Sequence, residues 1–385
     1  MPSARRCIVI GAGLLGLSAA RSLARRGWSV DVLEAGPTIG HPLAGSKGDV
    51  RIFRLGYPEP HYVEMAVAAR ALWRALEDEV GRPLLHVTGQ LGLGEPAELD
   101  AVADSLVRHG EPAERLSARD AAARFPGLSL SGPALFEPAS GVLEAGPCLE
   151  SLRATAAFDV QTATRVTEVV GTDDGATVHR ADGRTRHADV VVDCAGPAAL
   201  ALLAPSAVPA VAVAVAAPPS LPQVAYFRAT DKGTPDRAHP PVFIEWGDAM
   251  IYGLPVLGAG AHAGTYKVSH HTPGPLLDDY DPTAAPAPFL DVDDPALLGA
   301  LTDAVRRLLP GLDPEPVATE RCVYDNSVDT DFVLDRVGNV VVGCATSGHG
   351  FKFGPLLGEL LADLADGTAP SIDLHPFRLD RAARS

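Results

Sequence analysis

The feature that most constrains this chain is a glycine-rich turn near its N-terminus. Residues 7–10 are apolar and mostly β-branched, which predicts a short buried strand. Gly11, Gly13 and Gly16 follow at GxGxxG spacing. In such a unit the first glycine permits a tight turn, the second lets the backbone approach a pyrophosphate, and the third lets the following helix pack against the strand.

A second strand-like run, residues 30–33, ends on Glu34, eighteen residues after the last of these glycines. A carboxylate at this position can accept hydrogen bonds from an adenosine ribose, and the N-terminus of the helix favours the phosphates. The strand, turn, helix and acid together predict a dinucleotide site. They leave open whether the nucleotide is FAD or NAD.

Length and charge set limits on the rest. The chain has 385 residues, which suggests two domains, and its formal net charge of −16 makes nucleic acid and anionic membranes unlikely partners. No apolar run has the length of a membrane span, and the first strand begins too early to leave room for a signal peptide, so we expect a cytoplasmic protein. The cysteines, at positions 7, 148, 194, 322 and 344, lack CxxC spacing, so we expect neither a disulfide framework nor a metal site.

Strand-like runs near residues 7, 30, 190 and 340 are predicted to share one parallel sheet, although they are far apart in the sequence. Two Asp-Gly pairs, at 174–175 and 182–183, predict hairpins, and the runs 242–246 and 250–254 read as antiparallel strands. Residues 84–94 read as one strand. Helical periodicity is found over residues 61–79, 98–113, 117–125, 293–309 and 354–366.

The fold class that follows is α/β, with a Rossmann-type FAD-binding domain and a second, α+β substrate domain built on an antiparallel sheet. We assign residues 1–84, 141–215 and 315–385 to the nucleotide domain, which is therefore discontinuous. Residues 85–140 and 216–314 form the substrate domain.

A second strong signal lies near the C-terminus. Residues 344–355 place a turn of small residues, a histidine and a lysine between a buried strand and a helix. A helix N-terminus beside a redox-active ring would stabilise the negative charge that a flavin gains on reduction. Upstream, Arg51 and Arg54 share one side of a helix or opposite faces of a strand, and the sequence does not decide which.

Taken together, these motifs resemble those of the monomeric sarcosine oxidase family, FAD-dependent amine oxidases of the D-amino-acid oxidase superfamily. The resemblance rests on the glycine turn with Glu34 and on five further stretches in the family's order, which are residues 48–54, 252–255, Lys267 with His271, 321–324 and 347–353. It extends over nearly the whole chain.

The resemblance implies FAD as the cofactor, attached by a thioether from Cys322 to the flavin. Taken alone, a single cysteine is more often a small buried hydrophobic residue. Arg51 is expected to lie against the flavin, and Val166 to meet the adenine through its backbone. The remaining residues that the resemblance assigns to cofactor binding are Ser46, Lys47, Gly196, Gly348, Gly350, Phe351 and Lys352.

The same resemblance implies that Arg54 and Lys352 bind a substrate carboxylate, which suits a guanidinium fork and an ammonium group. The alternative for Arg54 is a salt bridge to Asp49 or Glu59. Lys267 is implied in the reaction with oxygen, His271 lies near the substrate amine, and Tyr252 lines the pocket. The adjacent His270, in contrast, reads as a plain exposed residue.

Some positions depart from the family pattern. Lys47 stands where the family usually has a histidine, Val50 replaces a common threonine, and the tryptophan often found after residues 195–197 is missing. The segment 258–264 is a few residues longer than in the sarcosine enzymes. Because these changes border the pocket, we hypothesise a substrate other than sarcosine itself.

The predicted activity is oxidation of a secondary or cyclic amino acid at its C–N bond to an imine, with oxygen reduced to hydrogen peroxide. The expected partners are an amino acid or amine and molecular oxygen, and the family favours a monomer. Alternatives are an oxidase of a cyclic imino acid in a biosynthetic pathway, an oxidase of a glycated amino acid, a catalytically silent flavin-binding protein, and an NAD-dependent dehydrogenase. The last gives no reason for Cys322 or for the stretch 348–352.

Overall fold

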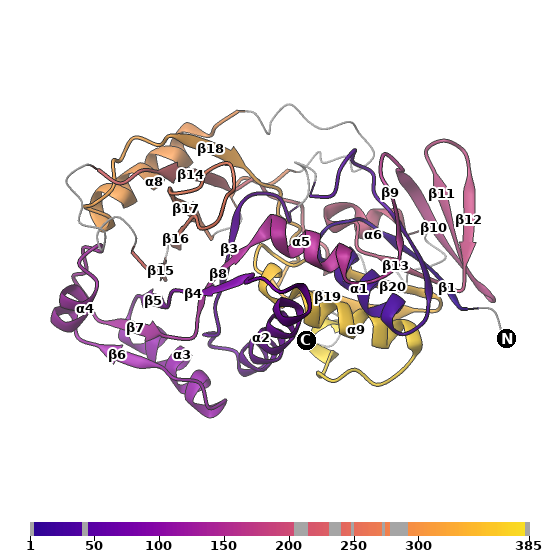
Figure 1. Cartoon of the computed structure of the whole chain (residues 1–385), viewed down its shortest axis with the longest axis horizontal. Helices are drawn as coiled ribbons and strands as arrows, with labels where there is room; N and C mark the ends of the chain where they lie inside the picture. The colour runs from indigo at the N-terminus through magenta and orange to yellow at the C-terminus, as the bar shows by residue number, and fades with distance from the viewer. Residues whose placement is uncertain are drawn as a thin grey trace.

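The computed structural model describes residues 4–40, 45–203, 215–230, 240–247, 250–271, 274–277 and 292–381. Its elements are arranged around two large sheets, one near the N-terminus and one on the opposite side of the molecule (Figure 1). This arrangement confirms the predicted fold class, a Rossmann-type α/β unit combined with an α+β unit.

The first sheet has six strands in the order β19-β20-β13-β1-β2-β9, all parallel except for the β19–β20 hairpin. The strands near residues 7, 30, 190 and 340 therefore share one sheet, as predicted. Its strands are β1 (Arg6–Ile10), β2 (Ser29–Leu33), β9 (Asp159–Gln161), β13 (Val190–Asp193), β19 (Val333–Val337) and β20 (Val340–Cys344).

Both faces of this sheet are covered, which explains why its central strands β1, β13 and β20 are mostly apolar. Cys7 and Val9 of β1 point into one core cluster, and Ile8 and Ile10 point into another. The second cluster is covered by the three-stranded meander β10 (Val166–Thr172), β11 (Gly175–Arg180) and β12 (Thr185–Ala188), and by the short helices η1 (Gly196–Ala198) and α6 (Ala199–Leu202). The Asp-Gly hairpins are confirmed, but the sequence had not indicated β12.

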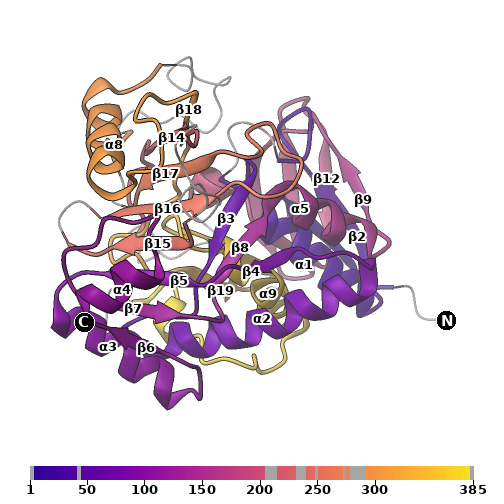
Figure 2. The same cartoon turned by 60° about the vertical axis from the view of Figure 1, so that its left-hand side comes forward.

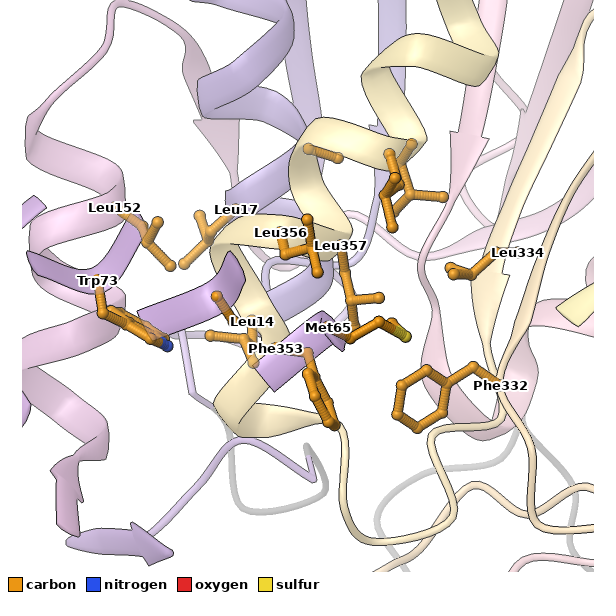
Figure 3. Close-up of a cluster of buried hydrophobic side chains, with 14 of the residues drawn as sticks. Leu14, Leu17, Met65, Trp73, Leu152, Phe332, Leu334, Phe353, Leu356 and Leu357 are labelled. Atoms are coloured by element: carbon orange, nitrogen blue, oxygen red, sulfur yellow. The ribbon is translucent and has the colours of Figure 1, made fainter. Parts of the chain in front are cut away.

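Helices cover the first cluster. Figure 3 shows Leu14 and Leu17 of α1 (Leu14–Arg25) meeting Leu356 and Leu357 of α9 (Gly354–Asp366). The two helices approach closely because α9 carries Gly358, where a Cβ atom would lie 2.6 Å from a backbone oxygen of α1. The neighbouring helices are α2 (Pro60–Val80), α5 (Ala145–Ala154) and η5 (His375–Phe377).

The second sheet has eight strands in the order β18-β14-β17-β16-β15-β5-β7-β6 and is antiparallel except for the β15–β5 pair. Its strands are β5 (Gln90–Leu93), β6 (Glu114–Leu116), β7 (Ala134–Glu137), β14 (Gln223–Phe227), β15 (Val242–Glu245), β16 (Ile251–Pro255), β17 (Tyr266–His270) and β18 (Ala318–Arg321). Its helices are α3 (Pro96–Arg108), α4 (Ala118–Arg124) and α8 (Pro295–Leu308).

A small sheet of β3 (Val50–Phe53), β8 (Gly141–Glu144) and β4 (Leu85–Val87) lies between the two large ones (Figure 2). The single strand predicted over 84–94 was wrong, because the chain breaks at Gly89, with φ of 73°, and sends β4 and β5 into different sheets. Arg51 lies in β3, so the backbone around it is an extended strand and not a helix.

The domain bounds stay a prediction, and residues 204–214 and much of 231–291 lie outside the described part of the chain. Within the described residues, no helix combines the length and apolarity that crossing a bilayer requires.

Candidate active site

The glycine turn is built as the fingerprint requires. Gly11 follows β1 with φ of 92°, and a Cβ atom there would lie 2.5 Å from the carbonyl oxygen of Cys194. At Gly16 a Cβ atom would lie 1.9 Å from the oxygen of Gly11, so α1 could not begin beside β1 with a larger residue. Gly13 is the N-cap of α1.

Two side chains hold this turn. Glu34 accepts hydrogen bonds from the amides of Ala12, at 2.7 Å, and Gly36, at 2.6 Å. Ser46 Oγ accepts from the amide of Leu14 at 2.9 Å. Both therefore lie at the N-terminal end of α1, where the sequence predicted a nucleotide.

A cavity opens between β3, the second sheet and the turn before α9, and it gathers eight of the predicted site residues. These are Arg51, Arg54, Tyr252, Lys267, His271, Gly348, Phe351 and Lys352. The other residues that line the cavity are Val50, Ile52, Ile244, Leu254 and His349.

Arg54 lies just beyond β3 and is only 5% exposed. Its guanidinium carbon is 3.8 Å from the ring centre of Tyr57 and 4.9 Å from that of Trp246. Nη1 is buried without a hydrogen-bond partner in the described part of the chain. Among the described residues, the alternative salt bridge of Arg54 to Asp49 or Glu59 is not formed, and Asp49 accepts hydrogen bonds from His262 instead, 3.0 Å from Nδ1.

Lys352, in η4 (Phe351–Phe353), is 4% exposed and lies beside Arg54. Its Nζ donates hydrogen bonds to the Tyr57 hydroxyl at 2.8 Å and to the His349 carbonyl at 2.6 Å. Burial, and then the positive charge of Arg54, hold the pKa of Lys352 well below its ordinary value. A bound anion would therefore stabilise the ammonium form.

The alternation along β17 separates its side chains. Lys267, 4% exposed, lines the cavity, and its Nζ lies 3.5 Å from the carbonyl oxygen of Val50. His270 points to the opposite face, where its Nε2 lies 3.3 Å from the carbonyl of Leu297 in α8. His270 is buried, so the expectation of an exposed residue was wrong.

His271 lies directly after β17, and its ring centre is 6.1 Å from that of Tyr252. Burial, with smaller contributions from the charges of Arg54 and Lys352, lowers the pKa of His271 to about 3. The imidazole is therefore neutral at physiological pH, and it can exchange a hydrogen bond with a substrate amine without adding a third cation.

Cys322 follows β18, is 7% exposed and packs in a cluster with Val50 and Tyr226. It has a free thiol. Arg51 turns back toward the loop before β3, where it donates hydrogen bonds to the carbonyls of Val50, Gly45 and Lys47, the first two at 2.9 and 2.8 Å.

The other predicted cofactor residues lie on several different elements. Val166 is buried at the start of β10, and Gly196 begins η1 with φ of 58°. Gly348 has φ of 75°, and a Cβ atom there would lie 2.3 Å from the ring of Tyr324. At Gly350 it would lie 2.5 Å from Thr346, so this turn also depends on glycine.

Tyr57, His349 and Trp246 contact Arg54 or Lys352 and were not predicted. Tyr57 could have been noticed because it comes three residues after Arg54, and His349 because it lies within the Gly-His-Gly turn. Trp246 carries no local signal, since only the pairing of β15 with β5 brings it over Arg54. Within the described residues, no group of three or more His, Cys, Asp or Glu side chains could hold a metal ion.

Comparison with known proteins places this geometry in a family. The model of the FAD dependent oxidoreductase family matches residues 6–364. The peroxisomal sarcosine oxidase of Mus musculus is 33% identical over 97% of this chain and 95% of its own length. The N-methyl-L-tryptophan oxidase of Salmonella newport is 31% identical, over 97% and 98%.

Among solved structures, the open form of NikD, described as an unusual amino acid oxidase essential for nikkomycin biosynthesis, is similar. It has a TM-score of 0.80 and 26% identity, over 98% of this chain and 97% of that one. The chain therefore belongs to the FAD-dependent oxidoreductase family. The predicted resemblance to the sarcosine oxidases, and the prediction of an FAD-dependent amine or amino-acid oxidase, are confirmed.

The residues present fit FAD. At Gly11 and Gly16 a Cβ atom would collide with backbone oxygens, and Gly13, the glycine that the fingerprint places against a pyrophosphate, is the N-cap of α1 with only Ser46 Oγ near the position of a Cβ atom, at 3.3 Å. At the other end, the cavity offers the buried and unpartnered Nη1 of Arg54 next to Lys352 and Lys267. The family match settles the choice between FAD and NAD that the fingerprint had left open.

Proposed function

We propose that this protein oxidises an N-methyl or other secondary amino acid at a C–N bond, and that Arg54 and Lys352 bind the substrate carboxylate. The observation that carries this proposal is two buried basic side chains, Arg54 and Lys352, in one cavity, neither of which forms a salt bridge with a carboxylate of the described residues. Buried charges are costly unless they are paired, so such a site favours an anionic ligand.

The two groups complement each other in binding a carboxylate. Arg54 has an unpartnered Nη1, and its planar fork can donate two parallel hydrogen bonds. Lys352 uses two donors on Tyr57 and His349, which leaves the third proton of the ammonium for a ligand. The names of the two relatives, a sarcosine oxidase and an N-methyl-L-tryptophan oxidase, support an amine that carries both an N-methyl group and a carboxylate.

The amine end of the substrate would face His271 and Tyr252. His271 is neutral, so it places no positive charge beside the substrate amine. The amine must itself be unprotonated, because its lone pair forms the carbon–nitrogen double bond. A hydride leaves the carbon next to nitrogen, the lone pair forms the C=N bond, and water hydrolyses the imine. FAD, when bound, would supply the acceptor for this hydride and a route for two electrons to oxygen, which with two protons would give hydrogen peroxide.

Lys267 is proposed to assist the reaction with oxygen. It is a buried ammonium on the second sheet, and a positive charge there would stabilise the negative charge that develops on oxygen. Cys322 is proposed to bind the flavin covalently. It is a free thiol packed against Val50, the strand residue whose carbonyl Lys267 approaches.

We further propose that the protein is a cytoplasmic monomer with the two domains assigned from the sequence. The cofactor roles of Gly11, Gly13, Gly16 and Glu34 belong to this proposal. So do those of Ser46, Lys47, Arg51, Val166, Gly196, Gly348, Gly350 and Phe351.

The test is peroxide release by the purified protein with a panel of substrates: sarcosine, N-methyl-tryptophan, a cyclic imino acid and a glycated amino acid. Each is paired with its amide, which keeps the amine but removes the negative charge. We expect release with at least one N-methyl amino acid and much less with its amide. Equal rates for the acid and the amide would contradict the carboxylate site, and no release from any compound would favour a catalytically silent flavin protein.

A further inference from the structure

We propose that Tyr57 and His349 are positioning residues that aim the Lys352 ammonium at the substrate carboxylate. The inference rests on the proposed function, since it names the support of the same site. Tyr57 and His349 both contact Lys352, and Tyr57 also contacts Arg54.

The carbonyl oxygen of Thr330 can only accept a hydrogen bond, and this fixes the direction of the hydrogen bonds that join His349, Tyr57 and Lys352. His349 Nε2 lies 3.1 Å from the carbonyl oxygen of Thr330, so Nε2 carries a proton. Burial, and then the charge of Lys352, hold the pKa of His349 well below its ordinary value, which makes the imidazole neutral. Its Nδ1 is then an acceptor, and it lies 3.3 Å from the Tyr57 hydroxyl.

Tyr57 must therefore donate its only hydroxyl proton to His349. The lone pairs of the Tyr57 oxygen remain, and one of them accepts the hydrogen bond from Lys352 Nζ at 2.8 Å. The chain from Thr330 through His349 and Tyr57 thus fixes where one Nζ proton points. The second Nζ proton is donated to the carbonyl oxygen of His349, which lies 2.6 Å from Nζ. With two protons fixed in this way, the tetrahedral geometry of the ammonium group sets the direction of the third.

The ring of Tyr57 supports the other cation. Its face lies 3.8 Å from the guanidinium carbon of Arg54, and a cation over an aromatic face is attracted by the ring electrons. Tyr57 is almost fully buried, so both contacts are made in a setting where water screens little. One side chain holds two like charges close together at the place where a carboxylate would bind.

The experiment uses Tyr57→Phe, which keeps the ring against Arg54 and removes the acceptor for Lys352. Tyr62→Phe is the matched control. Tyr62 stacks on Tyr57 at 5.0 Å between ring centres, but its hydroxyl donates to Asp331 at 2.7 Å, away from Lys352. The ligands are methoxyacetate, an ether analogue of an N-methyl amino acid that cannot be oxidised, and its neutral amide. The dissociation constants are read from changes in the flavin absorption spectrum of the holoenzyme.

We expect Tyr57→Phe to bind methoxyacetate about tenfold or more weakly, as for loss of a hydrogen bond to a charged group, with little change for the amide. Tyr62→Phe should bind both ligands as the wild type does. Equal weakening for the acid and the amide, or the same behaviour in both variants, would overturn the positioning role.

A second variant, His349→Phe, tests the same inference if Tyr57→Phe does not fold. His349→Phe removes the acceptor for Tyr57, so it should weaken methoxyacetate binding selectively, and unchanged selectivity would also overturn the inference. Failure of the carboxylate site and failure of the positioning role give different results. If the wild type itself fails to prefer methoxyacetate over the amide, the carboxylate site of the proposed function is wrong. If the wild type prefers methoxyacetate, and Tyr57→Phe and His349→Phe keep this preference as Tyr62→Phe does, then only the positioning role is wrong.

Discussion

Replacing Arg54 by lysine keeps the positive charge but removes the planar fork, and the structure allows its effect to be worked out. The guanidinium lies between the rings of Tyr57 and Trp246, 3.8 and 4.9 Å from their centres. A lysine ammonium is compact and strongly hydrated, so it cannot fill the same planar slot. It would also offer a point charge where the arginine offers two parallel donors.

The magnitude follows from these losses. One hydrogen bond between charged groups is worth about 1.5–3 kcal/mol, and the cation–π contacts of a buried cation add about 1 kcal/mol, part of which lysine retains. A net loss of about 2 kcal/mol corresponds to roughly 30-fold in KM. Because the carboxylate is bound equally in the ground state and the transition state, we expect kcat to change much less than KM.

The assay is steady-state peroxide release with the best N-methyl amino acid and with its amide. Arg70→Lys is the control, since Arg70 is on α2 and pairs with Glu111 at 2.7 Å, away from the cavity residues. We expect the KM for the acid to rise in Arg54→Lys and the KM for the amide to stay close to that of the wild type. Arg70→Lys should keep the wild-type KM for both compounds. An unchanged KM for the acid, or an equal rise for the amide, would refute this expectation.

Three further predictions concern other groups of the site. Cys322→Ala should leave the flavin in the supernatant after acid precipitation, whereas the wild-type flavin stays with the pellet, and colour in both supernatants would contradict covalent attachment. Lys267→Met should slow reoxidation by oxygen far more than anaerobic reduction by substrate, and equal slowing in stopped-flow traces would remove its oxygen role. Affinity for the methoxyacetate anion should fall as the pH rises through the depressed pKa of free Lys352, because the bound carboxylate requires the ammonium form. His271, whose pKa is about 3, contributes no titration at neutral or alkaline pH, so an affinity for the anion that does not fall anywhere as the pH rises would count against Lys352.

Much of the nucleotide sheet could be predicted because its signals are local. The central strands are mostly apolar, and the glycines stand at fixed offsets from β1. The helix α9 begins and ends as its leucine periodicity predicted. The break at Gly89 was missed because two short strands in different sheets look like one apolar run, and only long-range pairing separates them.

The charged residues of the candidate site could be predicted from positions that match the family's motifs, whereas its aromatic support could not. Arg54, Lys352 and Lys267 were predicted from the resemblance, and the structure brings them to one cavity. Their neighbours Tyr57 and Trp246 read as ordinary core residues. Their role depends on packing between β3, β15 and η4, which no spacing along the chain reveals.

The most direct test of the central claim is to add an N-methyl amino acid to the purified holoenzyme without oxygen and to record the flavin spectrum. The account predicts that the oxidised flavin band disappears with the acid and persists with the matching amide at the same concentration. Admission of air should restore the band and yield one hydrogen peroxide for each flavin. A protein that contains no flavin, or a flavin that the amide reduces as readily as the acid, would contradict the account.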